Sequence, residues 1–136
     1  MSLNKLHVMK AIITSVLLIV AAAAIYSSCK KGNRFTSVNV QEFANAIAQP
    51  GTQIVDVRTA EEYAAGHIDG SINIDVKKDN FKEIATTLLN KEKNVALYCR
   101  SGRRSKLAAD ILSAQGYSVV ELDGGYNEWT KHHCAK

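Results

Sequence analysis

Residues that interrupt or cross-link a chain are scarce in this sequence. Its 136 residues include one proline and three cysteines, and no acidic residue precedes Glu42. Three cysteines are too few for a small domain held together by disulfide bonds. The sequence contains a single long apolar run, which argues against a protein with several membrane spans.

The rest of the composition is that of one folded domain. Hydrophobic residues make up 46% of the chain, and the formal net charge is +4. These values exclude an intrinsically disordered chain, which combines few apolar residues with a high net charge. A chain of this length corresponds to one domain.

The apolar run extends from Ala11 to Tyr26 and follows two lysines, Lys5 and Lys10. It is shorter than a membrane-spanning helix, which needs about 20 apolar residues, and is closer to a signal-peptide core. Small residues then precede Cys29, a pattern that resembles the cleavage site of bacterial lipoproteins. The resemblance implies a signal peptide over residues 1–28 and a lipid on Cys29, which would anchor the protein in the bacterial cell envelope, facing the periplasm or the outer surface. An uncleaved N-terminal anchor is the alternative.

Cleavage before Cys29 would also change how the positive charge is interpreted. It removes Lys5 and Lys10 and no acidic residue, so the formal net charge falls from +4 to +2. A charge this small gives no basis for binding nucleic acid. We therefore expect the membrane, through the lipid anchor, and small molecules as partners, and no nucleic acid.

Helix and strand patterns alternate from Asn39 onward. Short apolar runs rich in β-branched residues predict buried strands, and apolar residues three and four positions apart predict helices. The expected strands are 53–57, 72–74, 94–99 and 117–122. Helices are expected after Asn39, Thr59 and Asn80 and over 104–115 and 126–131. Because the connections are short, the alternation predicts an α/β fold with an open parallel sheet flanked by helices on both faces.

Three of these helices begin with a pattern that predicts a capping box. In a capping box, a polar side chain and a glutamate three residues later each bond to the other's backbone N–H. The pairs are Asn39–Glu42, Thr59–Glu62 and Asn80–Glu83. The helical spacing of apolar residues also predicts that Leu88 and Leu107 face the core.

The loop after the third expected strand has the residues best suited to chemistry. Cys99 ends that strand. The residues that follow it are Arg100, Ser101, Gly102, Arg103 and Arg104. In open parallel sheets ligands bind beyond the carboxyl ends of the strands, where backbone N–H groups and a helix N-terminus converge on one point. Gly102 permits the tight turn that this requires.

A thiol in such an electropositive loop ionises more readily than a free one. It can attack an anionic substrate and retain the transferred group. We therefore predict that Cys99 is the catalytic nucleophile and that the five residues after it bind the substrate. A buried cysteine next to basic residues that only cap a helix is the structural alternative.

Three blocks of sequence, taken together and in this order, resemble the rhodanese family. They run from Asp56 to Ile74, from Tyr98 to Ser105, and from Asp123 to Trp129. The blocks span nearly the whole expected mature chain. The resemblance implies a single-domain rhodanese similar to the small periplasmic sulfurtransferases, with a rhodanese-like open parallel sheet.

The resemblance also implies a domain layout and a reaction. Residues 29–36 would form a tether, 37–132 the rhodanese-like domain and 133–136 a C-terminal tail. Members of the family take sulfane sulfur from a donor such as thiosulfate onto the loop cysteine, here Cys99, as a persulfide. They pass the sulfur to a thiol or to cyanide, without a cofactor.

The length of the loop distinguishes two chemistries among rhodanese-related proteins. Related phosphatases have an arginine six residues after the cysteine, which makes room for a tetrahedral phosphate. Here Ser105 occupies that position and Arg104 lies one residue earlier. The shorter loop favours the smaller sulfur group. A rhodanese-fold binding or redox-sensing module without sulfur turnover is the remaining alternative, although inactive modules usually lack the cysteine that this chain keeps.

Two charged residues at the end of the first expected strand, Asp56 and Arg58, are predicted to support the loop. The Asp56 carboxylate could accept loop N–H bonds or pair with Arg58, whereas the alternative is an ion pair between Arg58 and Glu62. His67 follows a glycine that ends a helix, so we expect a hydrogen-bonding turn residue rather than a base.

The C-terminus contains the residue types that bind metals, in the run His132-His133-Cys134. Adjacent side chains at a chain end cannot complete a tetrahedral site by themselves, so no metal site is predicted. Cys134 is expected to be dispensable for sulfur uptake and to act at most as an occasional resolving thiol.

If Cys29 carries lipid, the Cys29→Ala variant should accumulate as an unprocessed precursor that incorporates no labelled fatty acid. The physical reason is that acyl chains contribute about 0.8 kcal/mol per buried CH₂ to membrane binding, and this variant has no thiol on which to attach them. Gel mobility and metabolic lipid labelling measure both effects. Unchanged mobility and unchanged membrane partitioning would support the uncleaved anchor instead.

Overall fold

The computed structural model describes residues 5, 7–10, 12–14 and 35–133. The chain divides into two compact units, residues 1–32 and residues 33–136, and the described residues of the first unit are helical. Among the described residues, no helix is both long and apolar enough to span a membrane. Most of the predicted signal peptide lies outside the described residues, as do Cys29 and Cys134.

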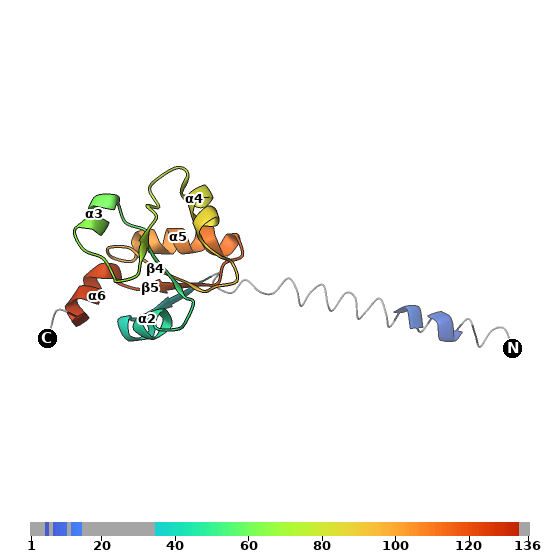
Figure 1. Cartoon of the computed structure of the whole chain (residues 1–136). Helices are drawn as coiled ribbons and strands as arrows, with labels where there is room; N and C mark the ends of the chain where they lie inside the picture. Colours follow the sequence, from blue (N-terminus) through green and yellow to red (C-terminus); the bar gives the residue numbers. More distant parts are fainter. Residues whose placement is uncertain (1–4, 6, 11, 15–34, 134–136) are drawn as a thin grey trace. The chain divides into compact units, whose positions relative to one another are not determined.

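The second unit is built on a parallel five-stranded sheet in the order β1-β5-β4-β2-β3. The strands are β1 (Thr36–Val38), β2 (Gln53–Asp56), β3 (Ile72–Asn73), β4 (Val95–Tyr98) and β5 (Val119–Leu122). The helices are α2 (Val40–Ile47), α3 (Ala60–Ala64), α4 (Phe81–Leu88), α5 (Arg103–Ala114) and α6 (Gly125–His133). Figure 1 shows α4 and α5 on one side of the sheet and α2 on the other, so the predicted parallel sheet with helices on both faces is confirmed.

The central strand β4 shows why both faces need a cover. All four of its residues are buried, and successive side chains point to opposite faces. Val95 and Leu97 pack in the cluster under α4 and α5, and Cys99, just beyond the strand, lies in the same cluster. Ala96 and Tyr98 pack in the other cluster, with residues from α2 and α6. Cys99 therefore belongs to the face that α5 covers.

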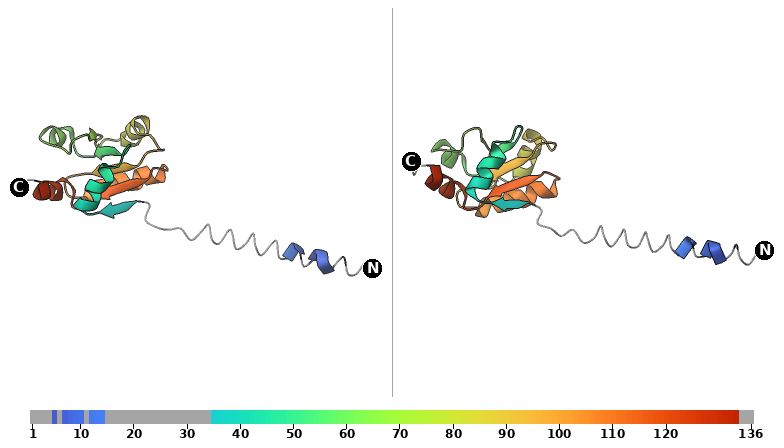
Figure 2. Two further views of the ribbon diagram at one scale, coloured as in Figure 1. Left: turned by 60° about the horizontal axis from the view of Figure 1, so that its bottom comes forward. Right: turned by 90° about the horizontal axis from the view of Figure 1, so that it is seen from below.

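Strand β1 was not expected from the sequence. It is three residues long, and it pairs with β5 at the edge of the sheet, which Figure 2 shows from below. Its first residue, Thr36, falls in the segment interpreted as tether. Two of its residues are exposed, so it lacks the apolar run that identifies a buried strand.

Two of the three predicted capping boxes are confirmed, those of α2 and α3. The third is wrong, because the Asn80 side chain caps no N–H group of α4. Its backbone has φ −94° and ψ 19°, whereas a capping residue is normally extended. The turn in which the Phe81 N–H donates to the Lys78 carbonyl holds Asn80 in this conformation.

The expected inward positions of Leu88 and Leu107 are also wrong, since these side chains are 58% and 56% exposed. In α4 the buried residues follow four-residue steps through Phe81 and Ala85 to Leu89, which turns Leu88 toward solvent. In α5 small residues occupy the core positions beside Leu107, so the helix packs closely on the sheet.

Candidate active site

Cys99 lies directly after β4, which has β5 on one side and β2 on the other. The residue is 1% exposed. Four residues later α5 begins at Arg103, so the loop reverses the chain between a buried strand and a helix N-terminus. The thiol is therefore held at the carboxyl edge of the sheet, where parallel folds place their ligands.

Two polar groups lie within hydrogen-bond distance of the sulfur. The Gly102 N–H lies 3.1 Å from Cys99 Sγ, and the Ser105 hydroxyl lies 3.4 Å from it. Gly102 has a φ of +95°, and a Cβ atom on it would lie 3.2 Å from the Gly124 nitrogen. A residue with a side chain would therefore be strained at this position, which agrees with the tight turn predicted from the glycine.

The opposite, carbonyl side of the loop bonds to α6. The N–H of Tyr126 donates to the Cys99 carbonyl at 2.8 Å, and the N–H of Asn127 donates to the Arg100 carbonyl at 3.0 Å. Gly125 makes this approach possible, because a Cβ atom there would lie 2.5 Å from the Cys99 carbonyl oxygen. With both carbonyls taken up by α6, the loop is fixed with an N–H group facing the sulfur.

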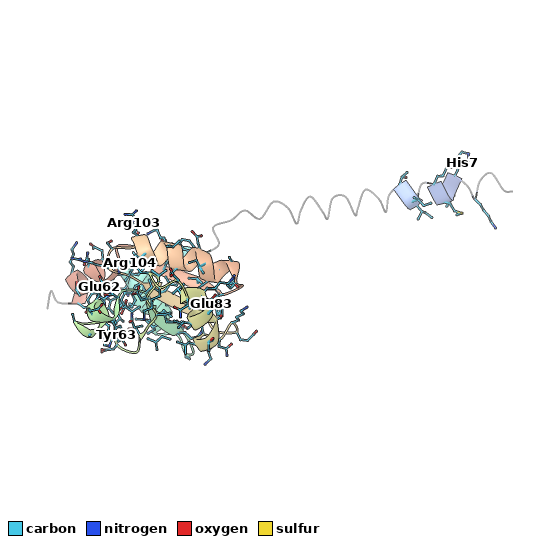
Figure 3. The ribbon with its side chains drawn as sticks, turned by 90° about the horizontal axis from the view of Figure 1, so that it is seen from above. His7, Glu62, Tyr63, Glu83, Arg103 and Arg104 are labelled. Atoms are coloured by element: carbon cyan, nitrogen blue, oxygen red, sulfur yellow. The ribbon has the colours of Figure 1, made fainter. Side chains whose placement is uncertain are left out.

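The three arginines of the loop do not share one environment. Arg104 makes a bidentate ion pair with Glu62, with nitrogen–oxygen distances of 2.6 and 2.8 Å. Figure 3 shows these two residues side by side, and Arg103 at the rim of the molecule. Arg100 and Arg103 are exposed, as is Ser101. The charges free to meet an anion in solution are thus those of Arg100 and Arg103.

The ion pair between Arg104 and Glu62 shifts the pKa of both partners. The hydrogen bond from Arg104 lowers the pKa of Glu62 to about 2, and the same bond raises the pKa of Arg104. Glu62 also accepts the Thr59 N–H bond of the α3 capping box. Arg104 therefore ties the first turn of α5 to the first turn of α3.

Asp56 and Arg58 form a buried pair beside the loop. The Arg58 side chain donates to both Asp56 carboxylate oxygens at 2.7 to 3.0 Å, and the Arg58 N–H donates to the same carboxylate. Burial alone lowers the pKa of Arg58, but the hydrogen bond and charge of Asp56 outweigh it and the pKa is raised. The alternative pairing of Arg58 with Glu62 is wrong, since Glu62 bonds to Arg104.

Arg58 also links β2 to α6. Its guanidinium lies 4.2 Å from the centre of the Tyr126 ring and donates to the Gly66 carbonyl at 2.6 Å. Tyr126 is the residue whose N–H bonds to the Cys99 carbonyl. The buried pair thus supports the loop through α6, and neither of its residues bonds to the sulfur.

Two histidine sites have structural contacts. His67 is exposed, stacks on Tyr63 with ring centres 3.8 Å apart, and makes a hydrogen bond to the Tyr63 carbonyl, as expected for a turn residue. His133 stacks on Trp129 in the same way. Within the described part of the chain, no three histidine, cysteine or acidic side chains gather as metal ligands do.

Two residues of this region, Glu121 and Ser105, were not predicted as site residues from the sequence. Glu121 is a fully buried glutamate on β5, and its carboxylate lies 2.6 Å from the Ser105 hydroxyl. The available signal was an acidic residue inside an otherwise apolar strand, which must have a polar partner when buried. For Ser105 the sequence offers no comparable signal, because its partner Glu121 lies on a different element.

Comparison with known proteins agrees with the fold. The sequence matches the rhodanese-like domain over residues 39–132. It is 36% identical to thiosulfate sulfurtransferase 18 of Arabidopsis thaliana over 118 residues, covering 78% of this chain and 86% of the relative. It is 42% identical to thiosulfate sulfurtransferase PspE of Escherichia coli over 74 residues, covering 54% of this chain and 70% of the relative.

Solved structures give the same result. A rhodanese-like domain protein from Staphylococcus aureus has a TM-score of 0.62 and 31% identity, covering 70% of this chain and 91% of that protein. A rhodanese-related protein from Thermoplasma volcanium has a TM-score of 0.62 and 29% identity, covering 72% and 93%. The chain has the rhodanese fold and belongs to the rhodanese-like domain family, in which thiosulfate sulfurtransferases occur.

The Arg104–Glu62 pair generates a prediction on acid stability. The Glu62→Gln variant should lose about 1 kcal/mol of unfolding free energy at neutral pH, because it removes a partly exposed ion pair. The Glu62 pKa is about 2 in the folded chain and ordinarily near 4.5. The stabilisation is therefore complete above that ordinary value and is lost as the pH falls through about 2, where wild type and variant should converge.

Urea unfolding at several pH values measures this difference. The matched control is Glu42→Gln, which alters the same position of the α2 capping box but has no arginine partner among the described contacts. A Glu62→Gln defect that does not change with pH, or an equal defect in Glu42→Gln, would show that the ion pair is not its cause.

Proposed function

We propose that this protein is a sulfurtransferase that moves sulfane sulfur from thiosulfate, or a related anionic donor, to a thiol or cyanide acceptor. The transferred sulfur would be carried as a persulfide on Cys99. The observation that carries the proposal is the sulfur atom held at the end of β4, with an N–H group directed at it and a hydroxyl within hydrogen-bond distance. Relatives named thiosulfate sulfurtransferases support the choice of donor.

The first half-reaction begins with the Cys99 thiolate. It attacks the outer sulfur of thiosulfate and forms a sulfur–sulfur bond. The bond from that sulfur to the sulfonate group breaks, and sulfite leaves with the electron pair. The product is Cys99 persulfide, whose negative charge the Gly102 N–H and the positive end of α5 stabilise.

The second half-reaction regenerates the thiolate. A cyanide or thiolate acceptor attacks the terminal sulfur of the persulfide, and the sulfur–sulfur bond to Cys99 breaks with its electron pair left on Cys99. Thiocyanate or a small persulfide leaves. No oxidant or cofactor is needed, because each step exchanges one sulfur nucleophile or leaving group for another.

The exposed arginines would gather the donor. Arg100 and Arg103 carry positive charge at the surface next to the loop, whereas the Arg104 charge is compensated by Glu62. Unpaired charge around a site raises the local concentration of an anion and the rate at which it arrives. We therefore assign donor recruitment to Arg100 and Arg103, and loop positioning to Arg104.

A binding or redox-sensing module without sulfur turnover is the rival function. Its site would need no donor and would leave the arginines without a ligand.

We also propose that the domain works at the bacterial cell envelope, held by a lipid on Cys29. The N-terminal pattern of lysines, apolar residues and Ser-Ser-Cys supports this location.

Exposure of the protein to thiosulfate should add one sulfur atom, about 32 Da, to Cys99 and to no other residue. Peptide mass spectrometry without a reducing agent measures the addition. Cys99→Ser should take up no sulfur and form no thiocyanate, because serine cannot make a persulfide. Cys134→Ser, a second cysteine change, should behave as wild type. Absence of the added sulfur in wild type, or turnover by Cys99→Ser, would contradict the proposal.

Replacing Arg100 or Arg103 by glutamine should raise the KM for thiosulfate about 3- to 10-fold at low salt, with a smaller change in kcat. The effect should shrink as salt rises, since surface charges are screened beyond about 10 Å at 0.1 M ionic strength. Steady-state kinetics at several salt concentrations measure both. Lys93→Gln is the control, because Lys93 is exposed and precedes β4 at the opposite end of that strand. A salt-independent loss confined to kcat would disprove recruitment.

A further inference from the structure

Glu121 stands out among the buried residues of the domain. It is 0% exposed, and it lies on β5 between two buried or half-buried apolar neighbours. Burying a carboxylate is costly unless its oxygens are bonded. Each of its two oxygens has a partner, so the hydrogen bonds offset the cost of burying the carboxylate.

The two oxygens point to different neighbours. Oε1 accepts a hydrogen bond from the Ser105 hydroxyl at 2.6 Å. Oε2 accepts one from the Ser37 hydroxyl on β1 and lies 3.5 Å from the ammonium of Lys106. Lys106 in turn pairs with Asp123 at 2.8 Å, so its charge is shared between two carboxylates. Oε1 thus faces Ser105 beside the active-site loop, and Oε2 faces Ser37 on the edge strand together with Lys106 of α5.

Ser105 connects Glu121 to the reacting sulfur. Its oxygen lies 2.6 Å from Glu121 Oε1, 3.4 Å from Cys99 Sγ and 3.0 Å from the Gly102 carbonyl oxygen. A hydroxyl has one hydrogen to donate and two lone pairs to accept with. When its hydrogen is directed at the carboxylate, as the shortest contact favours, a lone pair is free to accept the thiol hydrogen of Cys99.

We propose that Glu121 receives the thiol proton of Cys99 through Ser105. The Cys99 S–H proton passes to Ser105 Oγ while the Ser105 hydroxyl proton passes to Glu121 Oε1. The S–H bond breaks with its electron pair left on sulfur, and a neutral carboxylic acid forms on Glu121. Ser105 ends as a hydroxyl that now donates to the thiolate. The proposal rests on the proposed function, in which this thiolate attacks the donor.

Charge and burial both favour such a transfer. Cys99 is 1% exposed, so the Ser105 hydroxyl already in contact with the sulfur is a closer proton acceptor than the bulk solvent. If Cys99 and Glu121 were ionised together, two negative charges would lie close to each other in the core. The cations near them, Lys106 at Glu121 and Arg104 near Cys99, are each already paired with another carboxylate. A single proton shared between the two groups keeps one negative charge in the site before and after the transfer.

A purely structural role for Glu121 predicts the opposite experimental result. If Glu121 only ties Ser37 and β1 to the sheet, its negative charge opposes ionisation of Cys99. Removing that charge would then make the thiolate easier to form. If Glu121 accepts the proton, removing the carboxylate makes the thiolate harder to form near neutral pH. The direction of the change decides between the two.

The experiment measures the rate at which iodoacetamide, a neutral reagent, alkylates Cys99 in the full-length protein between about pH 5 and 9. Peptide mass spectrometry assigns the modification to Cys99. Glu121→Gln keeps the shape of the side chain and an oxygen that accepts hydrogen bonds. It should alkylate about tenfold more slowly than wild type near pH 7, and the deficit should disappear at high pH, where hydroxide removes the proton. Faster alkylation, or an unchanged rate, would overturn the proposal.

Two serine variants provide a matched pair of controls. Ser105→Ala breaks the connection and should slow alkylation as Glu121→Gln does, and the double variant should be no slower than either single one. Ser37→Ala removes the other hydroxyl on the same carboxylate and should leave the rate near that of wild type. A thermal unfolding transition for each variant confirms that it is folded. Equal slowing in Ser37→Ala and Ser105→Ala would assign the effect to packing and contradict the relay.

The test separates this inference from the proposed function, because alkylation requires no sulfur transfer. If wild type takes no sulfur from thiosulfate but the order of alkylation rates holds, the sulfurtransferase assignment fails and the relay stands. If sulfur is taken up and Glu121→Gln alkylates as fast as wild type, only the relay fails.

Discussion

The active-site loop can have its amide side turned toward the sulfur because its carbonyl side is bonded elsewhere. Two N–H groups at the start of α6, from Tyr126 and Asn127, take up the carbonyls of Cys99 and Arg100. A buried carbonyl without a partner would cost about 1–3 kcal/mol, so the contact with α6 stabilises this conformation of the loop. The close approach requires a residue without a side chain at Gly125. Helix α6, which is distant from the loop in sequence but in contact with it, therefore sets the geometry around the thiol.

The charged residues around the loop fall into two groups, those paired within the protein and those exposed to solvent. Buried or partly buried pairs, Asp56 with Arg58 and Glu62 with Arg104, connect elements around the loop and leave no net charge for a ligand. The exposed Arg100 and Arg103 keep theirs. Bonding one arginine into the scaffold fixes the loop, and the exposed charges of its neighbours would serve the proposed anionic donor.

The general architecture was predictable from the sequence because it depends on patterns that are local. Continuous apolar runs indicate buried strands, and the capping boxes at Asn39 and Thr59 depend on residues only three positions apart. The third predicted capping box was wrong, because the turn from Lys78 to Phe81 fixes the backbone conformation of Asn80. The predicted burial of Leu88 and Leu107 was wrong, because tertiary packing decides how a helix is rotated on a sheet. The spacing of apolar residues describes that rotation only approximately.

The same distinction between local and long-range features applies to the candidate site. Cys99 and the loop glycine could be located from sequence, since a strand, a tight turn and a helix follow one another within a few residues. The partner of Arg104 could not, because Glu62 lies 42 positions away. The contact between Ser105 and Glu121 joins residues on different elements, and strand alternation alone does not reveal which face of the sheet carries the site. Long-range pairings of this kind require the fold.

The most direct test of the account is a single-turnover measurement of sulfite. When thiosulfate is mixed with the protein and no acceptor is present, each chain should release one sulfite and then stop, because the transferred sulfur remains on Cys99. The Cys99→Ser variant should release none. Release that continues beyond one equivalent without an acceptor, or equal release from the variant, would contradict a persulfide on Cys99 as the carrier of the transferred sulfur.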